Sequence, residues 1–346
     1  MKTFGALHIH NYKPTIIAEA GVNHSCNLKL ALKYVELAKK SGADAIKFQT
    51  YKAEKIVAKF SPAYWDTTKE KTKSQFELFK KYDKFDYNDY FKIYRKCIKE
   101  KILFMSSLFD TDAVDEYDHL LKVYKISSSD INNVPLLKKI SSKKKFTIIS
   151  TGGSSINEIK KAIYYLDLPA HKVCIMHCIL NYPAKAKDAK LNYLKYLKTK
   201  FPNHLIGYSD HVNTNKELIQ LQVAYEFGAQ IIEKHFTHNK NNKGNDHYHS
   251  MDYKDLLKFN DIMRLRSSLI GVGKKNLNKE KVSIKYARRS IFCKKNIAKN
   301  EILSEKNLIT LRPGNGISAS NWLKVIGKKS KYNLEKGRMI KHKDFI

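Results

Sequence analysis

The stretch that decides the fold spans residues 16–50 and reads IIAEAGVNHSCNLKLALKYVELAKKSGADAIKFQT. A short apolar run at 16–20 precedes an amphipathic helical pattern at 28–41, which Gly42 ends, and a second apolar run follows at 45–50. A glycine just after the last periodic residue is a common helix stop. A strand, a helix and a strand in this order predict a βαβ unit with two parallel strands.

The same alternation continues to about residue 270. Apolar runs predict eight strands, at 16–20, 45–50, 102–107, 123–127, 146–151, 173–178, 205–209 and 230–235. Helical patterns occupy eight further segments, at 28–41, 88–101, 111–121, 136–142, 155–166, 191–200, 216–227 and 253–269. Strands and helices in this number and order predict an α/β fold, a (β/α)8 TIM barrel over residues 1–270.

The repeating pattern stops near Gly271. Residues 271–285 (GVGKKNLNKEKVSIK) are rich in Lys and Asn, and we expect a helix-poor linker there. Residues 286–346 contain two short apolar runs, SIFCKK and ITLRP, and a turn signal, PGNG, at 313–316. The sequence therefore predicts a small second domain over 286–346.

The basic residues do not favour a nucleic-acid partner. Lys and Arg number 65 against 33 Asp and Glu, which makes the formal net charge +32. Only seven of the 65 are Arg, whose forked guanidinium suits nucleic-acid recognition, and the 58 Lys are spread along the whole chain. We expect no nucleic-acid partner, although the positive potential can steer an anionic substrate toward a cleft.

Membrane and disulfide signals are also missing from the sequence. No apolar run approaches the roughly 18 residues of a membrane helix, and residues 1–14 lack the basic start and apolar stretch of a signal peptide. We therefore expect no membrane partner and a cytoplasmic location. The five cysteines form no CxxC pair, and we expect reduced, mostly buried thiols.

Polar side chains gather where the predicted strands end. In a parallel barrel these ends form one mouth, which is where active sites lie. The polar residues at or near strand ends are Glu19, Lys47, Gln49, Ser106, Ser107, Lys125, Ser150, Thr151, His177, Ser209, Asp210, His211, Lys234 and His235. So many titratable and hydroxyl groups in normally apolar strands predict an active site at this mouth.

Several kinds of chemistry are available at the mouth. His211 and His235 end adjacent strands and could ligate one divalent metal, with Asp246 in the following loop. Lys47 and Lys125, facing hydroxyls at Ser128, Ser150 and Ser209, suit a small phosphorylated or carboxylated anion.

Glu19 ends the first strand among apolar neighbours, so burial should raise its pKa and make it a candidate acid or base. The alternative role for this carboxylate is a salt bridge to a barrel lysine. A strand-end lysine could also form a Schiff base with a carbonyl substrate, as in an aldolase, and spacing alone does not exclude it.

Seven ordered motifs together resemble the sialic acid synthase family. They are residues 16–50, YKISSSDINNVPLL, ISTGGSS, HCILNYPAK, GYSDH, IEKHFT and RPGNGIS. The resemblance covers about residue 15 to the C-terminus. It implies a TIM barrel joined to a small antifreeze-like (SAF) domain, and an enzyme that condenses phosphoenolpyruvate with an N-acetylated hexosamine such as N-acetylmannosamine. The products would be a nine-carbon 2-keto acid and phosphate.

The resemblance also implies roles for individual residues. Lys47, Lys125, Ser128, Ser150 and Ser209 match positions that hold phosphoenolpyruvate, and His211 and His235 match the metal ligands, with Mn²⁺ expected and Mg²⁺ or Co²⁺ as alternatives. Glu19 matches the catalytic glutamate. Gln49, Tyr182 and Asp246 match substrate-pocket positions, as does Arg312, which in the family reaches the partner's barrel mouth in a domain-swapped homodimer.

The identity of the sugar stays open at this stage. Asp130 stands where many N-acetylneuraminate synthases carry Glu, and one methylene changes the reach toward the sugar. We expect an N-acetylneuraminate synthase, with legionaminate or pseudaminate synthase as the alternatives. An aldolase, or a carbohydrate- or nucleic-acid-binding protein with an inert barrel, would release no phosphate from phosphoenolpyruvate.

Overall fold

The structure, a computed structural model, describes residues 2–68, 70–214, 217–244, 246–271, 273 and 275–346. The start of the helix expected at 216–227, and residues 272 and 274 of the expected linker, lie outside these ranges. The chain divides into two compact units, Met1–Ile270 and Gly271–Ile346.

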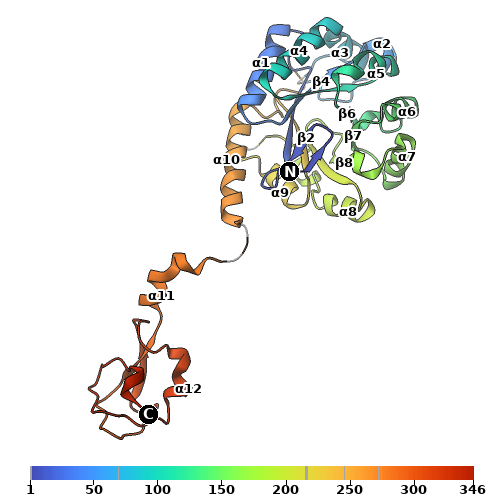
Figure 1. Ribbon diagram of the computed structural model, residues 1–346. Helices are drawn as coiled ribbons and strands as arrows, with labels where there is room; N and C mark the ends of the chain where they lie inside the picture. Colours follow the sequence, from blue (N-terminus) through green and yellow to red (C-terminus); the bar gives the residue numbers. More distant parts are fainter. Residues whose placement is uncertain (1, 69, 215–216, 245, 272, 274) are drawn as a thin grey trace. The chain divides into compact units, whose positions relative to one another are not determined.

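The first unit is a closed barrel of parallel strands in the order β10-β3-β4-β5-β6-β7-β8-β9, with helices around it (Figure 1). Its strands are β3 (Thr15–Gly21), β4 (Ala45–Thr50), β5 (Leu103–Leu108), β6 (Val123–Ile126), β7 (Phe146–Ser150), β8 (Val173–Cys178), β9 (Leu205–Asp210) and β10 (Ile231–His235). Each strand begins and ends within one residue of its predicted range. β10 pairs with β3, with Ile231 opposite Thr15, and this pairing closes the barrel. The predicted TIM barrel is confirmed.

Each strand is followed by one of the predicted helices. These are α1 (Leu28–Lys40), α4 (Tyr87–Glu100), α5 (Thr111–Tyr117), α6 (Val134–Ser142), α7 (Ile156–Leu166), α8 (Tyr193–Lys200), α9 (Ile219–Glu226) and α10 (Tyr253–Ile270). Side chains cap several of their amino ends: the Asn27 side chain accepts a hydrogen bond from the Leu30 N–H, and Ser155 and Glu158 form a capping box on α7. These caps fix where the helices begin after their loops.

Several short elements have no counterpart among the predictions. A hairpin of β1 (Lys2–Phe4) and β2 (Leu7–Ile9) precedes the barrel, and α2 (Ala53–Ile56) and α3 (Gln75–Tyr82) lie in the long connection between β4 and α4. Further short 3-10 turns are η2 (Ser128–Asp130), η3 (Ala170–Lys172) and η4 (Ala186–Asp188), whereas η1 (Asp118–Leu120) follows α5 directly and lies within the helix predicted at 111–121. The long connection becomes important at the mouth of the barrel.

The barrel interior is apolar at the amino ends of the strands. Strand side chains alternate between the interior and the surrounding helices. The buried apolar cluster inside contains Ile17, Ala45, Met105, Val123, Phe146, Ile148, Cys174, Met176, Leu205 and Ile231. Leu7 and Ile9 of β2 belong to the same cluster, so the hairpin closes this end of the barrel.

The second unit is built around an antiparallel pair, β11 (Ser290–Cys293) and β12 (Leu308–Leu311), with η6 (Ala319–Asn321), α12 (Trp322–Val325) and η7 (His342–Asp344). Ile291, Leu303, Leu308 and Ile340 are among its buried core residues. The expectation of a helix-poor segment at 271–285 is wrong, because η5 (Leu277–Glu280) and α11 (Lys281–Ala287) lie there. No side chain of α11 is buried, so no apolar stripe marked this helix in the sequence.

In the part of the chain that the structure describes, no helix is long and apolar enough to span a bilayer. The five cysteines are free, and all of them except Cys26 are buried.

Candidate active site

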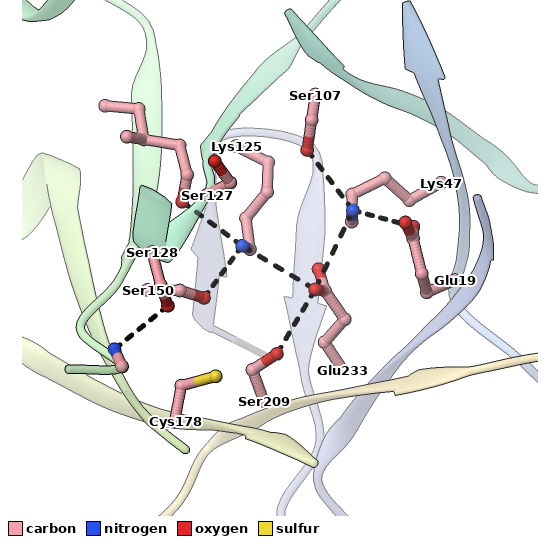
Figure 2. A network of polar contacts seen from close by, with 12 residues as sticks. Glu19, Lys47, Ser107, Lys125, Ser127, Ser128, Ser150, Cys178, Ser209 and Glu233 are labelled. Carbon is pink, nitrogen blue, oxygen red and sulfur yellow. Dashed lines mark hydrogen bonds and ion pairs between the residues drawn. The ribbon is translucent and has the colours of Figure 1, made fainter. Parts of the chain in front are cut away.

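The carboxyl-end half of the barrel interior is polar. Because every second residue of a strand shares a face, Ile17 is followed inside the barrel by Glu19, and Ala45 by Lys47. The buried side chains of this layer are Glu19, Lys47, Ser107, Lys125, Ser150, Ser209 and Glu233. They line an inner cavity of about 50 Å³, and Figure 2 shows how they converge.

Two lysines and two carboxylates form the centre of this layer. Lys47 Nζ lies 2.7 Å from Glu19 Oε2 and 3.7 Å from Glu233 Oε1. Lys125 Nζ lies 3.6 Å from the same Glu233 oxygen, so Glu233 stands between the two lysines (Figure 2). The four groups balance in charge when all are ionised. An anion that enters must therefore replace a carboxylate as the partner of an ammonium group.

Serine hydroxyls complete the inner cavity. Lys47 donates a hydrogen bond to Ser107 Oγ over 3.2 Å, and Lys125 donates one to Ser150 Oγ over 2.8 Å. Ser209 Oγ donates to Glu233 over 3.3 Å, and Ser128 Oγ accepts from the Gly152 N–H over 2.9 Å. The structure thus brings together the predicted anion-binding set, Lys47, Lys125, Ser128, Ser150 and Ser209.

The pKa values of the central groups are shifted in opposite directions. Burial, together with the charge of Glu233, raises the pKa of Glu19 to about 7 against the lowering effect of Lys47. Burial would raise the pKa of Glu233 too, but Lys125 and Lys47 outweigh it and the pKa is lowered. One carboxylate is therefore held ionised, whereas Glu19 can gain or lose a proton near neutral pH.

Histidines lie beside the inner cavity, at the ends of β9 and β10. The rings of His211 and His235 have their centres 5.5 Å apart, and the Tyr182 ring centre lies 4.0 Å from that of His211. His235, Asp246 and His249 could hold a metal ion, because their ligand atoms lie within 4.8 Å of one another. Sequence reasoning paired His235 with His211 and noted Asp246, but it missed His249.

The donor groups fit a divalent cation. His235 Nδ1 is buried, makes no hydrogen bond within the described residues and lies 3.5 Å from Asp246 Oδ2. Burial lowers the pKa of His235 well below its ordinary value, which keeps the ring neutral and able to ligate. His211 Nδ1 lies 2.7 Å from the Ile179 carbonyl oxygen. As donor in this hydrogen bond, Nδ1 leaves the lone pair of Nε2 free for a metal.

The other predicted residues differ in their surroundings. Gln49 lines the cavity and donates a hydrogen bond to Glu19 Oε1 over 2.9 Å. Asp130 lines neither the inner cavity nor the adjoining cavity of about 140 Å³ at the mouth, and it accepts hydrogen bonds from Ser127 and Ser129, its neighbours in the chain. Arg312 is exposed on the turn after β12 in the second unit. Asp130 is thus engaged locally, while Ser127 and Ser129 line the mouth instead.

Some strand-end residues that the sequence placed at the mouth face the helices instead. His177 bonds the Ala189 carbonyl oxygen over 2.7 Å, and Ser106 bonds Thr50 over 2.7 Å. Lys234 and Asp210 form an ion pair of 2.6 Å whose side chains are 0% exposed. The alternation along each strand separates these residues from Glu233 and His235, which face the interior.

Glu233 is the central residue that sequence reasoning missed. It lies two positions before His235 and therefore on the same face of β10. That spacing was the available signal, since an inward His235 implies an inward Glu233. His249 lies in the loop after β10, where no periodicity predicts the direction of a side chain.

Family models match both units of the chain. The model of the NeuB family matches residues 34–275, and that of the SAF domain matches residues 288–346. The chain belongs to the NeuB family. The resemblance to sialic acid synthases, and the predicted SAF domain, are confirmed.

Individual relatives in the NeuB family match over nearly the whole chain. The N,N'-diacetyllegionaminic acid synthase of Campylobacter jejuni is 38% identical over 95% of this chain and 99% of its own. The enzyme of the same name from Legionella pneumophila is 36% identical over 93% and 92%. The crystal structure of N-acetylneuraminic acid synthetase from Leptospira borgpetersenii aligns with a TM-score of 0.68 at 30% identity, over 82% of this chain and 94% of that one. Because these homologues are nonulosonic acid synthases, this member of the NeuB family is an enzyme.

Proposed function

We propose that this enzyme condenses phosphoenolpyruvate with the aldehyde of an N-acetylated amino sugar and with water, giving a nine-carbon 2-keto acid and phosphate. The observation that carries the proposal is the pair of buried lysines, each beside a serine hydroxyl and a carboxylate, next to a histidine cluster. The similarity to two N,N'-diacetyllegionaminic acid synthases favours a legionaminate-type product over the N-acetylneuraminate expected from the sequence.

Lys47 and Lys125 bind the carboxylate and the phosphate of phosphoenolpyruvate in this proposal. Charge-assisted hydrogen bonds to such groups are about twice as strong as neutral ones. Ser128, Ser150 and Ser209 supply further hydrogen bonds from the cavity wall. Burial lowers the pKa of Lys125, and an anionic ligand would restore the charged form by pairing with it.

Glu19 moves protons in this reaction. C3 of phosphoenolpyruvate forms a bond to the aldehyde carbon, whose oxygen becomes a hydroxyl group by taking up a proton. Glu19 supplies that proton and regains one from the water that adds at C2. Phosphate then leaves by cleavage of its C–O bond and takes up the proton of the C2 hydroxyl, so that a keto group remains. A carboxyl with a pKa of about 7 suits both acceptance and return of a proton.

The histidine cluster would hold a divalent cation. His235 and His211, with Asp246 and His249 alongside, offer imidazole nitrogens and a carboxylate, a donor set suited to Mn²⁺, with Mg²⁺ or Co²⁺ as alternatives. When bound, such an ion polarises a carbonyl oxygen as a Lewis acid. Tyr182 packs against His211 and helps to orient its ring.

Arg312 completes the site from the second unit in this proposal, across a domain-swapped homodimer. Its guanidinium is exposed, and a planar fork of donors suits the N-acetyl carbonyl or hydroxyls of a sugar. Apolar side chains near the end of α10, Leu265, Leu269 and Ile270, are 61%, 77% and 63% exposed and could be covered by a second copy.

One experiment tests the reaction class. The enzyme is incubated with phosphoenolpyruvate, N-acetylated hexosamines and Mn²⁺, and phosphate and keto acid are followed with and without EDTA. We expect equal amounts of both products, loss of activity in EDTA and in His235→Ala, and full activity in His171→Ala, an exposed histidine on η3. A lysine trapped by borohydride with pyruvate, in the absence of phosphate release, would replace this proposal with the aldolase.

A further inference from the structure

A third imidazole lies beside the two histidines that the family resemblance assigns to the metal. His249 is buried in the connection between β10 and α10, and its ring centre lies 4.9 Å from that of His235. His249 is not among the ligand positions that the resemblance implies. It nevertheless belongs to the group of close ligand atoms in this structure, together with His235 and Asp246.

The spacing of these three side chains suits a single ion. One nitrogen of His235, one nitrogen of His249 and one carboxylate oxygen of Asp246 lie within 4.8 Å of one another. Metal–nitrogen and metal–oxygen bonds are about 2.0–2.2 Å long, so two ligand atoms on one ion lie up to about 4.4 Å apart. Small rotations of the side chains are therefore enough to bring all three atoms into contact with one cation.

The backbone around His249 is held by hydrogen bonds to neighbouring segments. The Met251 N–H donates to the His235 carbonyl oxygen over 2.8 Å, and the Thr237 N–H donates to the Met251 carbonyl oxygen over 2.9 Å. The Thr214 hydroxyl donates to the carbonyl oxygen of His249 itself over 3.1 Å. These bonds tie the loop to the end of β10 and fix the position of His249 before an ion binds.

A buried amide after β3 holds the same loop from another direction. The Asn23 side-chain amide donates to the Phe236 carbonyl oxygen over 3.0 Å and to the Ser250 hydroxyl over 3.3 Å. Ser250 directly follows His249 in the chain. Because ligands that are already in place lose little conformational freedom on binding, this arrangement favours a site that binds its ion without help from a substrate.

A third imidazole changes which ions the site prefers. Imidazole nitrogen suits transition metals, whereas Mg²⁺ prefers oxygen ligands and usually keeps several water molecules. Three imidazoles and the Asp246 carboxylate would occupy four of the six positions around an octahedral ion. Two positions would stay open for oxygen atoms of a substrate or of water, as a Lewis-acid role requires.

We propose that His249 is a third imidazole ligand of the cation, and that it makes the site retain the ion in the free enzyme and select Mn²⁺ or Co²⁺ over Mg²⁺. This inference rests on the cation site of the proposed function and is independent of the condensation reaction. The competing role for His249 is packing alone, since its ring centre lies 6.0 Å from that of Tyr182 and 5.2 Å from that of Tyr248.

The first test measures cation binding in the absence of both substrates. Metal-free enzyme is titrated with Mn²⁺, Co²⁺ or Mg²⁺ in a calorimeter. Loss of a hydrogen-bond partner behind a metal ligand costs about 10–100-fold in metal affinity, and loss of a direct ligand should cost at least as much. We therefore expect His249→Ala to raise the Kd for Mn²⁺ and Co²⁺ about tenfold or more, and the Kd for Mg²⁺ less than about threefold.

His238→Ala is the matched control for this titration. It removes an imidazole from the same connection, but His238 Nδ1 lies 2.9 Å from the Tyr34 hydroxyl oxygen on α1, outside the ligand group. Its Kd values should equal those of the unaltered enzyme. Unchanged Kd values in His249→Ala, together with loss of binding in His235→Ala, would overturn the inference and leave the condensation intact. The expected Kd values without phosphate release by the metal-loaded enzyme would support His249 as a ligand and reject the condensation.

The second test locates the ion in the unaltered enzyme, so it does not depend on whether a variant folds. Crystals that contain Mn²⁺ are measured at a wavelength at which manganese scatters anomalously. We expect the anomalous peak about 2.0–2.3 Å from one ring nitrogen of His249 and one of His235. A peak bound by His211 and His235 but more than about 3 Å from both nitrogens of His249 would overturn the inference.

Discussion

The barrel contains two buried groups of lysine and carboxylate side chains, one facing the helices and one facing the interior. They differ in how many of their polar atoms are hydrogen-bonded. On the helix side, Asp210 Oδ2 accepts from Lys234 over 2.6 Å and from Gln220 over 3.0 Å, while Oδ1 accepts from the Tyr208 hydroxyl over 2.8 Å and from the Val212 N–H over 3.0 Å. On the interior side, Glu233 Oε2 is buried and has no hydrogen-bond partner within the described residues.

The difference separates structural charges from charges available for chemistry. In the outer pair, Lys234–Asp210, both carboxylate oxygens accept two hydrogen bonds, and the pair ties the end of β9 to β10. The inner group consists of Lys47, Lys125, Glu19 and Glu233. It lines a cavity, and Glu233 Oε2 has no hydrogen-bond partner among the described residues, so a ligand can rearrange its ion pairs. Buried ion pairs of the same chemistry thus serve stability on one face of a strand and reactivity on the other.

The comparison predicts the largest stability change for the outer pair. Asp210→Asn should lower the free energy of unfolding by about 3–5 kcal/mol, because the Lys234 ammonium stays buried without its counter-charge. Urea unfolding measures the change. The double variant Asp210→Asn/Lys234→Met should recover part of the loss, and Lys125→Met should cost clearly less than Asp210→Asn. Equal losses for both single variants would remove the distinction.

The inner lysines should show their effect in substrate binding. Lys47→Met or Lys125→Met removes one charge-assisted contact of about 1.5–3 kcal/mol, equivalent to about a ten- to hundredfold rise in the KM for phosphoenolpyruvate. The KM for the sugar should change little. Steady-state kinetics with each substrate varied in turn measure both values, and parallel rises would indicate a general structural defect.

Binding of phosphoenolpyruvate should be accompanied by proton uptake. With a pKa of about 7, Glu19 is largely ionised at about pH 8 in the free enzyme, and a nearby anion raises the pKa of a carboxyl group. Uptake should decrease below about pH 6, where Glu19 is already protonated. Titration calorimetry in buffers of different ionisation enthalpy measures the protons. The Glu19→Gln variant should take up fewer protons when phosphoenolpyruvate binds. Unchanged proton uptake in this variant would mean that another group takes up the proton.

The proposed domain-swapped homodimer predicts that two inactive variants restore each other's activity. Arg312→Ala and His211→Ala should each be inactive alone, whereas their mixture should recover part of the activity after subunit exchange, because one mouth per heterodimer is intact. Verified exchange without recovery would exclude the swapped arrangement. A mixture of His211→Ala with His235→Ala, both in the barrel, should stay inactive and serves as the control.

The sequence predicted the barrel well because strand signals and strand ends are local. Short apolar runs mark β3 to β10, and the polar residues at their ends mark the mouth. The direction in which each strand-end side chain points was harder to predict. Asp210 and Lys234 are residue types that are common in active sites, but they face the helices. The alternation of side chains would have separated them from Glu233.

Residues outside regular elements were beyond prediction for a different reason. The loop after β10 brings His249 close to His235. The cavity of about 140 Å³ at the mouth is lined in part by the connection between β4 and α4, whose side chains follow no period. Their positions depend on tertiary packing, which a single sequence does not reveal. Arg312 was singled out by resemblance alone, and the structure of its own unit adds only that the side chain is exposed.

The hairpin at the amino end of the barrel has a consequence for the timing of turnover. Leu7 and Ile9 close that end, so molecules enter and leave through the same mouth. In the proposed reaction phosphoenolpyruvate lies deeper than the sugar, and we expect it to bind first. The phosphate released beneath the new keto acid then departs only after that product has left. A barrel with a single opening thereby sets the order of substrate binding and product release, which none of its catalytic groups determines.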